Sequence, residues 1–303
     1  MIQAPFHSGE TAAQARAGHV LEKAAIRDFM PDQHRSFFAD QRILLIGAES
    51  DRDGPMASVL HGPAGFIGSP DPQSLTIAAR PDADDPLDRL LTVGRSIGLL
   101  GIDLSNGRRN RANGKISAAA PTGFTVGIEQ SFGNCPKYIQ ARDLRDDPAP
   151  AAAPPVENLN ALDGAAKAFI TQADTLFVAS STGSGALTNG GVDISHRGGQ
   201  AGFIKVADDH LTIPDFSGNR YCNTLGNFMV NPRAALLFID FNDGSLLHLA
   251  GTAAIDWTPP PVAGALRSWR FSISGGWRRR SALPLRWRFR GWAESTLGTG
   301  VWE

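Results

Sequence analysis

Hydrophobic positions along the chain form short apolar runs, and turn-forming residues separate them. Runs of this length, divided by Asp, Gly and Pro, are typical of antiparallel β-strands. Asn106-Gly107 adds a strong hairpin signal. The pattern predicts a mainly β fold, either a barrel or a sandwich. Four such runs occur in the first part of the chain: residues 42–48, 56–60, 75–77 and 97–104.

Helical spacing of apolar residues is confined to segments that flank these runs. We expect Asp32 to cap the second of these helices. A further strand at residues 175–179 then starts the alternation of strand and turn again. The overall expectation is a β-barrel architecture with flanking helices. The helical segments are residues 12–23, 32–38, 87–92 and 164–171.

The second part of the chain repeats the first at a separation of 137 residues. Residues 65–67 recur as 202–204, and Ser58 recurs as Ser195. A constant offset across Gly, Phe and Ser positions predicts an internal duplication. We therefore expect two barrel-like halves. They should pack as a pseudo-dimer, because a homodimer interface survives duplication.

The duplication predicts a division of the chain into four parts. The last part is rich in Arg and Trp, a composition that permits stacking on nucleic acid. We favour instead a segment that covers the barrel with its Arg side chains outward. The parts are an N-terminal half with its helices at 1–145, a linker at 146–160, a C-terminal half at 161–258 and the tail at 259–303.

Composition narrows the classes of function. The net charge of -1 provides no global field that would attract nucleic acid or a membrane surface. The 2 cysteines do not form a disulfide scaffold and fit a reducing cytoplasm. No long apolar span, secretory signal or metal-ligand spacing is present in the sequence. We expect a cytoplasmic protein without a metal site, a membrane association or a nucleic-acid partner.

Two polar loops in the second half carry the candidate chemistry. Ser195, His196 and Arg197 end one strand, and Arg220 lies in a later loop close to Asn223 and Thr224. Arg beside hydroxyl and amide groups is the usual arrangement for holding a phosphate, because guanidinium presents a planar fork of donors. The simpler interpretation of each Arg alone is a solvated loop charge. Together the loops predict an anion-binding site.

The first half has different residues at the equivalent positions. Val59 and Leu60 replace the His-Arg pair, and acidic residues at 82–85 replace the second Arg loop. The first half has therefore lost these cationic partners. We expect one site in each chain, with the first half supplying its opposite wall.

These loops resemble a known family. Residues 193–199 and 215–224 resemble motifs of the pyridoxamine 5'-phosphate oxidase-like flavoproteins, which have the FMN-binding split β-barrel fold. Residues 132–139 and 6–10 resemble further motifs of a two-halved subgroup. The resemblance implies FMN between the two barrels. Ser195, His196 and Arg197 would lie along the flavin and ribityl chain, and Arg220, Asn223 and Thr224 would hold the phosphate.

The implied activity is an FMN-dependent oxidoreductase that takes electrons or hydride from a donor such as NAD(P)H and serves an unknown small substrate. A pyridoxal phosphate pocket does not match. A flavin carrier or sensor without turnover stays open, as does a split barrel that binds deazaflavin or haem. Haem would need an axial ligand such as His196 or His61. Pairing of two chains into a homodimer also stays open.

The catalytic candidates are His196 and Cys135. Pro136 can serve as the first residue of a helix, which would place Cys135 at a helix N-terminus. That position would lower the pKa of the thiol and make it more reactive. The alternative is an inert, packed cysteine. His7 and Glu10 form either an acid–base pair or, in the interpretation we favour, an anchor for the N-terminal segment.

Overall fold

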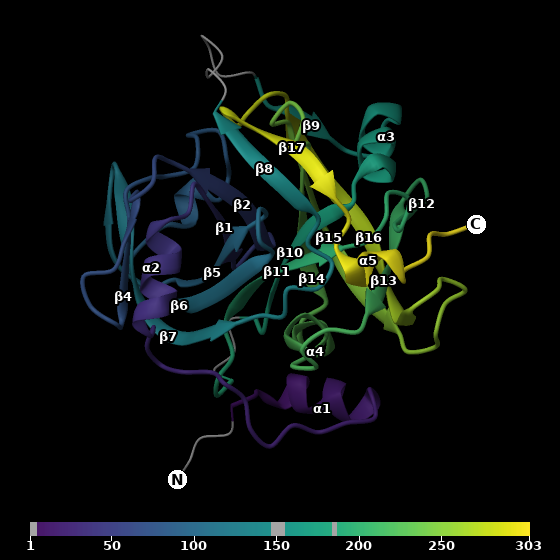
Figure 1. Ribbon diagram of the computed structural model, residues 1–303, viewed down its shortest axis with the longest axis horizontal. Helices are drawn as coiled ribbons and strands as arrows, with labels where there is room; N and C mark the ends of the chain where they lie inside the picture. The colour runs from purple at the N-terminus through teal and green to yellow at the C-terminus, as the bar shows by residue number, and fades with distance from the viewer. Residues whose placement is uncertain (1–4, 147–154, 184–186) are drawn as a thin grey trace.

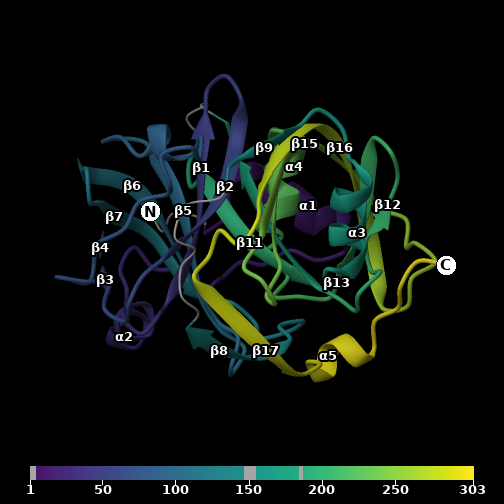
Figure 2. The same cartoon turned by 90° about the horizontal axis from the view of Figure 1, so that it is seen from above.

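The computed structural model describes residues 5–146, 155–183 and 187–303. Most of the expected linker at 146–160 lies outside the described residues. The molecule consists of two barrels side by side, with the first half and the second half separated in the view from above (Figure 1, Figure 2). Both barrels are built from antiparallel strands, so the mainly β expectation is confirmed.

The first half forms one seven-stranded sheet in the order β2-β1-β5-β6-β7-β4-β3. Every neighbouring pair in it is antiparallel. The strands are β1 (Ile43–Ser50), β2 (Gly54–His61), β3 (Ile67–Gly68), β4 (Ser74–Ile77), β5 (Ser96–Asp103), β6 (Arg108–Ala120) and β7 (Gly123–Gly133).

The second half repeats this topology. Its sheet has the order β11-β10-β14-β15-β16-β13-β12, which is the same order when its strands are counted from β10. β9 (Glu157–Leu159) adds to β16 outside this path. The matching strand order confirms the two halves predicted from the sequence repeat. The strands are β10 (Thr175–Ser181), β11 (Val192–Gly198), β12 (Lys205–Val206), β13 (His210–Phe216), β14 (Arg233–Ile239), β15 (Leu246–Asp256) and β16 (Ala265–Arg279).

The central strands are buried on both faces, which explains their nearly continuous apolar sequence. In β1, Leu44 and Ile46 point into the first barrel, whereas Leu45 joins a cluster shared by both halves. In β10, Val178 packs inside the second barrel and Phe177 joins the shared cluster. Alternation along each strand therefore builds two barrel cores and one core between them.

Helices cover the edges of the barrels and one face of the interface. Asp32 is the first residue of α2, and its N-cap is Pro31, which makes no side-chain cap. The expected helix at 87–92 is a short 3-10 turn. The helical elements are α1 (Ser8–Arg16), α2 (Asp32–Ala39), η1 (Asp88–Leu90), α3 (Gly164–Gln172), α4 (Asn223–Val230) and α5 (Glu294–Leu297).

The N-terminal helix belongs with the second half, which corrects the expected division of the chain. α1 packs against α4 at the base of the second barrel (Figure 1). Its Gln14 amide donates to the Tyr221 carbonyl at 3.1 Å. Further along, Arg27 forms an isolated bridge with Ser131 of the first half. The N-terminal segment thus runs from the second barrel to the first.

The expected tail at 259–303 is also wrong. β16 is an interior strand of the second sheet, with β15 on one side and β13 on the other. The second half therefore extends to Arg279 rather than ending at 258. β17 (Leu285–Gly291) then pairs with β8 (Ala141–Asp146), and these two strands lie side by side at the junction of the halves (Figure 1). In β17, Arg residues occupy every second position, and Leu, Trp and Phe occupy the positions between them, so the two kinds of side chain lie on opposite faces of the strand.

None of the helices found in the described residues has the length and apolar character required to cross a membrane.

Candidate functional site

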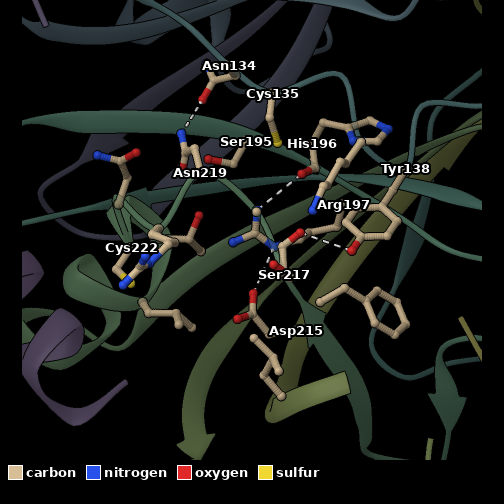
Figure 3. A pocket seen from close by; sticks show the side chains of 18 of the residues that line it. Asn134, Cys135, Tyr138, Ser195, His196, Arg197, Asp215, Ser217, Asn219 and Cys222 are labelled. Atoms are coloured by element: carbon tan, nitrogen blue, oxygen red, sulfur yellow. Dashed lines mark hydrogen bonds and ion pairs between the residues drawn. The ribbon is translucent and has the colours of Figure 1, made fainter. Parts of the chain in front are cut away.

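A cavity of about 290 Å³ lies between the two halves. We call it the inter-half cavity. All six residues expected to hold a cofactor line it: Ser195, His196, Arg197, Arg220, Asn223 and Thr224. The first half contributes the opposite wall through Leu100, Arg109, Arg111, Asn134, Cys135, Lys137 and Tyr138. The structure therefore brings the two sequence-predicted loops together, as Figure 3 shows for several of the side chains.

The lining of the inter-half cavity is strongly cationic. Asp215 is the carboxylate among its lining residues. The cationic lining residues are Arg109, Arg111, Lys137, Arg197, Arg220 and Arg267. Such a concentration of positive charge in a partly enclosed site favours an anionic ligand.

His196 is fixed by an arginine from the other half. Nη1 of Arg109 lies 3.0 Å from Nδ1 of His196. Because a guanidinium can only donate, Nδ1 accepts and the ring proton lies on Nε2. Burial, together with the neighbouring Arg109 and Arg197, holds the pKa of His196 well below its ordinary value. His196 is therefore a neutral donor with a defined tautomer.

Ser195 and Asp193 are held by β6 of the first half. Arg111 donates to Asp193 Oδ1 at 2.8 Å and also to the Ser195 hydroxyl. Asn113 donates to the same Asp193 oxygen at 2.7 Å. On the other side, Asn227 of α4 donates to Asp193 Oδ2 at 2.9 Å. These bonds fix the side chains of β11 at the junction of the halves.

Arg197 lies between Asp215 and the backbone of His196 (Figure 3). Its Nη1 donates to the His196 carbonyl at 3.2 Å. Its Nε is 3.8 Å from Asp215 Oδ1, and Arg267 Nε is 3.3 Å from Asp215 Oδ2. Burial raises the pKa of Asp215, and the two guanidiniums oppose that rise. One carboxylate therefore orients two arginines at the cavity wall.

The second polar loop leads into α4. Arg220 has φ 69° and an exposed side chain, and its carbonyl oxygen lies 2.9 Å from His19 Nε2. Asn223 and Thr224 form the first turn of α4. The Asn223 amide donates to Glu10 of α1. The N-terminal segment thus supports the loop from behind.

The two cysteines have different surroundings. Burial raises the pKa of the Cys222 thiol to about 11, so this residue stays protonated at neutral pH. The Sγ atom of Cys135 lies 3.7 Å from Nη2 of Arg109. The helix expected after Cys135 is absent, because residues 137–138 form a turn and Tyr138 has φ 62°. A residue in the left-handed region interrupts a right-handed helix. The helix-based argument for a reactive Cys135 is therefore wrong.

Several buried donors around the inter-half cavity lack a hydrogen-bond partner within the described part of the chain. Each is a group that donates, and a buried donor without an acceptor costs about 1–3 kcal/mol. The set favours a ligand that is rich in acceptors. The atoms are Arg111 Nε, Asn134 Nδ2, His196 Nε2 and Thr224 Oγ1.

The position related by the sequence repeat is closed. Ser58 donates to Asp85 there, and Arg279 pairs with Asp82 and Asp84. His248 stands where the offset places Arg111, and it stacks on Trp277 with ring centroids 3.4 Å apart. Only about 30 Å³ of space is left. We call this region the closed counterpart. Its own side chains occupy the volume that is open in the inter-half cavity.

The sequence predictions missed the contribution of β6. Arg109 and Arg111 follow the Asn106-Gly107 turn at alternate positions, so they share one face of a strand. That alternation was the available signal. It could not show that the face points into the other half. His61, the second expected haem ligand, lies beside the closed counterpart rather than in the inter-half cavity.

Comparison with known proteins concerns the fold. No protein-family model matches the chain, and no curated protein matches it in sequence. Among solved structures, HupZ of Group A Streptococcus has 14% identity and a TM-score of 0.29, covering 37% of this chain and 89% of itself. A protein related to general stress protein 26 from Clostridium acetobutylicum, of the pyridoxinephosphate oxidase family, has 15% identity and a TM-score of 0.28. It covers 41% of this chain and 92% of itself.

A FAD-binding protein from Mesorhizobium loti has 14% identity and a TM-score of 0.26, with 41% of this chain and 97% of its own length covered. Each of these proteins corresponds in length to about one half, and the strand order of the two halves is the same. At these identities and TM-scores the matches say nothing about the activity of this chain.

Among the described residues, no group of His, Cys, Asp or Glu is arranged to hold a metal ion.

Proposed function

We propose that this split-barrel protein binds FMN in the inter-half cavity and acts as an oxidoreductase on an unknown small substrate. The observation that carries the proposal is the cavity lining, in which six cationic side chains face one carboxylate. Unpaired donors accompany those charges. FMN combines a phosphate dianion with a ring that is rich in acceptors, so both of its ends match this lining.

The phosphate would lie at the mouth of the cavity. Arg220 is exposed there, and Asn223 and Thr224 begin α4. A helix N-terminus presents free backbone N–H groups and a partial positive charge to an anion. The Thr224 hydroxyl is buried without a partner among the described residues. These groups would bind the phosphate through several charge-assisted hydrogen bonds.

The flavin ring would lie deeper, against β11. His196 would offer its Nε2 proton as a neutral donor, because Arg109 occupies Nδ1. Arg197 would offer a guanidinium that Asp215 already orients. Groups fixed before binding lose little entropy when the ligand arrives. FMN, when bound, supplies the electron or hydride transfer itself, and the chain supplies orientation and donors near the ring.

Haem fits the same residues poorly. A histidine that ligates a metal through Nε2 usually donates its Nδ1 proton to an acceptor. In this protein Nδ1 of His196 faces the guanidinium of Arg109, which has no acceptor to offer. The structure therefore favours a phosphorylated flavin over haem. A deazaflavin shares the phosphate chemistry, and its absorption spectrum distinguishes it from FMN.

The proposal is tested by FMN titration of the purified protein, followed by its visible spectrum. The Arg197→Ala/Arg220→Ala double variant should weaken FMN binding about 100-fold or more, since each charged hydrogen-bond partner contributes about 1.5–3 kcal/mol. The matched control is Arg52→Ala/Arg280→Ala, which removes two exposed arginines outside the cavity. Unchanged binding by the first variant would refute the site.

Turnover separates an oxidoreductase from a flavin carrier or sensor. We expect NADH or NADPH to bleach the flavin absorption of the loaded protein, and an added electron acceptor to restore it. A protein that keeps FMN oxidised with both donors would instead be a carrier or a sensor.

A further inference from the structure

A second cavity lies behind the wall of the inter-half cavity. Its volume is about 660 Å³, and residues of both halves line it, with the N-terminal segment at one side. We call it the acidic cavity. Arg111 lines the first cavity, and Asp193, its ion-pair partner at 2.8 Å, lines the second. The same pair therefore forms part of the partition between the two cavities.

The charge of the acidic cavity is opposite to that of its neighbour. Glu10, Asp28, Glu129 and Asp193 line it, and Lys115 is the ammonium among its lining residues. Lys115 pairs with Glu129 at 3.5 Å, and both side chains are largely exposed at the rim. Glu10, which is 4% exposed, accepts hydrogen bonds from the His7 backbone amide and the Asn223 side chain, and its Oε2 lies 3.6 Å from His7 Nε2. Acidic lining alone would not define a site, because carboxylates are common on surfaces.

One buried polar side chain, Asn113, adds independent evidence for a ligand. Asn113 is 8% exposed, and its amide donates to Asp193, which leaves Oδ1 as an acceptor without a partner in the described chain. His7 is 3% exposed, and its Nδ1 accepts from the Gly9 amide at 3.1 Å. The Nε2 atom of His7 then carries the proton and lies 3.6 Å from Glu10 Oε2, so His7 is a neighbour of Glu10 and is not itself evidence for a ligand. Both residues line the acidic cavity.

We propose that the acidic cavity binds a small organic cation with N–H donors, such as a primary amine. Asn113 Oδ1 and the Glu10 carboxylate would accept hydrogen bonds from the ammonium group. Asp193 would add long-range attraction, although its oxygens are already bonded to Arg111, Asn113 and Asn227. An ammonium ion presents three donors and no acceptor, which matches unpaired acceptors in an acidic site. This site is independent of which cofactor the inter-half cavity holds.

The protonation state of Glu10 should make amine binding detectable as a release of protons. Burial and the nearby Asp193 raise the pKa of Glu10 to about 8, so the carboxyl is protonated at neutral pH. The His7 backbone amide just before α1, Asn223 on α4 and Arg111 on β6 oppose this only in part, and the His7 imidazole also faces the carboxyl at 3.6 Å. A bound ammonium would lower the pKa of Glu10. Amine binding near neutral pH should therefore release a proton.

The test uses isothermal titration calorimetry of the full chain with four probes. We expect 1,4-diaminobutane and n-butylamine to bind. Tetramethylammonium, a cation without N–H donors, and 1-butanol, a neutral analogue, should bind at least about 10-fold more weakly. Titration in two buffers of different ionisation enthalpy should show proton release with the amines. Amines that bind no tighter than about 10 mM would overturn the proposal.

Two variants locate the binding. Glu10→Gln keeps an oxygen that can accept from the His7 amide, and it should weaken amine binding about 10-fold or more and abolish proton release. Asn113→Ala removes the unpaired acceptor and should weaken binding as well. Glu22→Gln, an exposed position of the same N-terminal segment, should bind as the unmodified protein does. Equal affinity in all of these proteins would show that the amine binds elsewhere.

Discussion

The tautomer and the hydrogen bonding of individual side chains in this protein depend on partners from the opposite half. The tautomer of His196 depends on Arg109, and the hydroxyl of Ser195 depends on Arg111. Neither arginine lies near these residues in the sequence. The chemical character of the β11 site is therefore a property of the interface, and substitutions in β6 should alter the site as much as substitutions in β11 itself.

Glu10 gives a prediction about pH and stability. Its pKa of about 8 in the folded protein lies above the ordinary 4.5, so folding favours the protonated form. The stability that protonation provides is present below pH 4.5 and is lost as the pH rises to 8. Between these limits the free energy of unfolding should fall by about 1–4 kcal/mol because of this group.

Urea denaturation of the unmodified protein and of Glu10→Gln measures that difference. The two curves of stability against pH should diverge between pH 4.5 and 8, with the variant relatively more stable at the upper end. Glu22→Gln should follow the unmodified protein. Parallel curves for Glu10→Gln would mean that the carboxyl is ionised in the folded state throughout.

The sequence identified six residues that line one cavity and the segment around Cys135 on its opposite wall, yet it missed two arginines of β6. The Arg loops were recognisable because Arg beside Ser, Thr and Asn has a specific chemistry. Arg109 and Arg111 were not, since only the packing of two barrels turns their strand face toward β11. Cys135 lines the cavity, but the helix expected after it is absent for a local reason, because Tyr138 takes φ 62°.

At the scale of elements, the contact of α1 with α4 positions the phosphate-type loop. Gly226 of α4 faces α1 so closely that an added Cβ would lie 2.5 Å from Glu10 Cα. Only glycine allows the two helices to approach to this distance. This contact brings Glu10 within reach of Asn223, and Gln14 within reach of Tyr221.

Gly226→Ala should separate these helices and destabilise the protein by about 1–3 kcal/mol, which is the usual cost of overpacking. FMN affinity should fall with it, because the loop loses its support. Gly164→Ala is the matched control, since an added Cβ at that helical position meets nothing within 4 Å. Chemical denaturation of both variants checks the first effect, and FMN titration checks the second. Equal stability of the two variants would contradict the close packing.

The elements themselves were largely predictable. Strand periodicity and turn residues indicated β1, β2, β4, β5 and β10 within a few residues of their ends. The segment after residue 258 was not, because its Arg and Trp alternation was interpreted as a surface cover. A strand with one charged face and one apolar, aromatic face gives the same composition, and β17 is of that kind.

On the scale of the whole molecule, duplication produced two similar barrels but unequal sites. The offset of 137 residues correctly indicated the repeat, since strand order depends on the apolar pattern that both halves retain. In the closed counterpart, ion pairs of Arg279 and the stack of His248 on Trp277 occupy the space of a ligand. The asymmetry lies in side chains and leaves the backbone topology unchanged.

We therefore expect one FMN for each chain. Equilibrium dialysis at saturating FMN should give a ratio near one, and Arg279→Ala should leave that ratio unchanged because the stacked His248 and Trp277 still fill the closed counterpart. A ratio near two in the unmodified protein would show that the closed counterpart opens.

The interior position of β16 also bears on synthesis of the protein at the ribosome. Until residues 265–279 emerge, β13 and β15 each lack one neighbour, and the second barrel has two open edges. Unpaired edges can join to those of other nascent chains. The first barrel has all its strands by residue 133, so it can form early. In the second barrel β13 ends at Phe216 and β16 is complete only at Arg279, so we expect its edges to be open to such pairing while the segment between them is made.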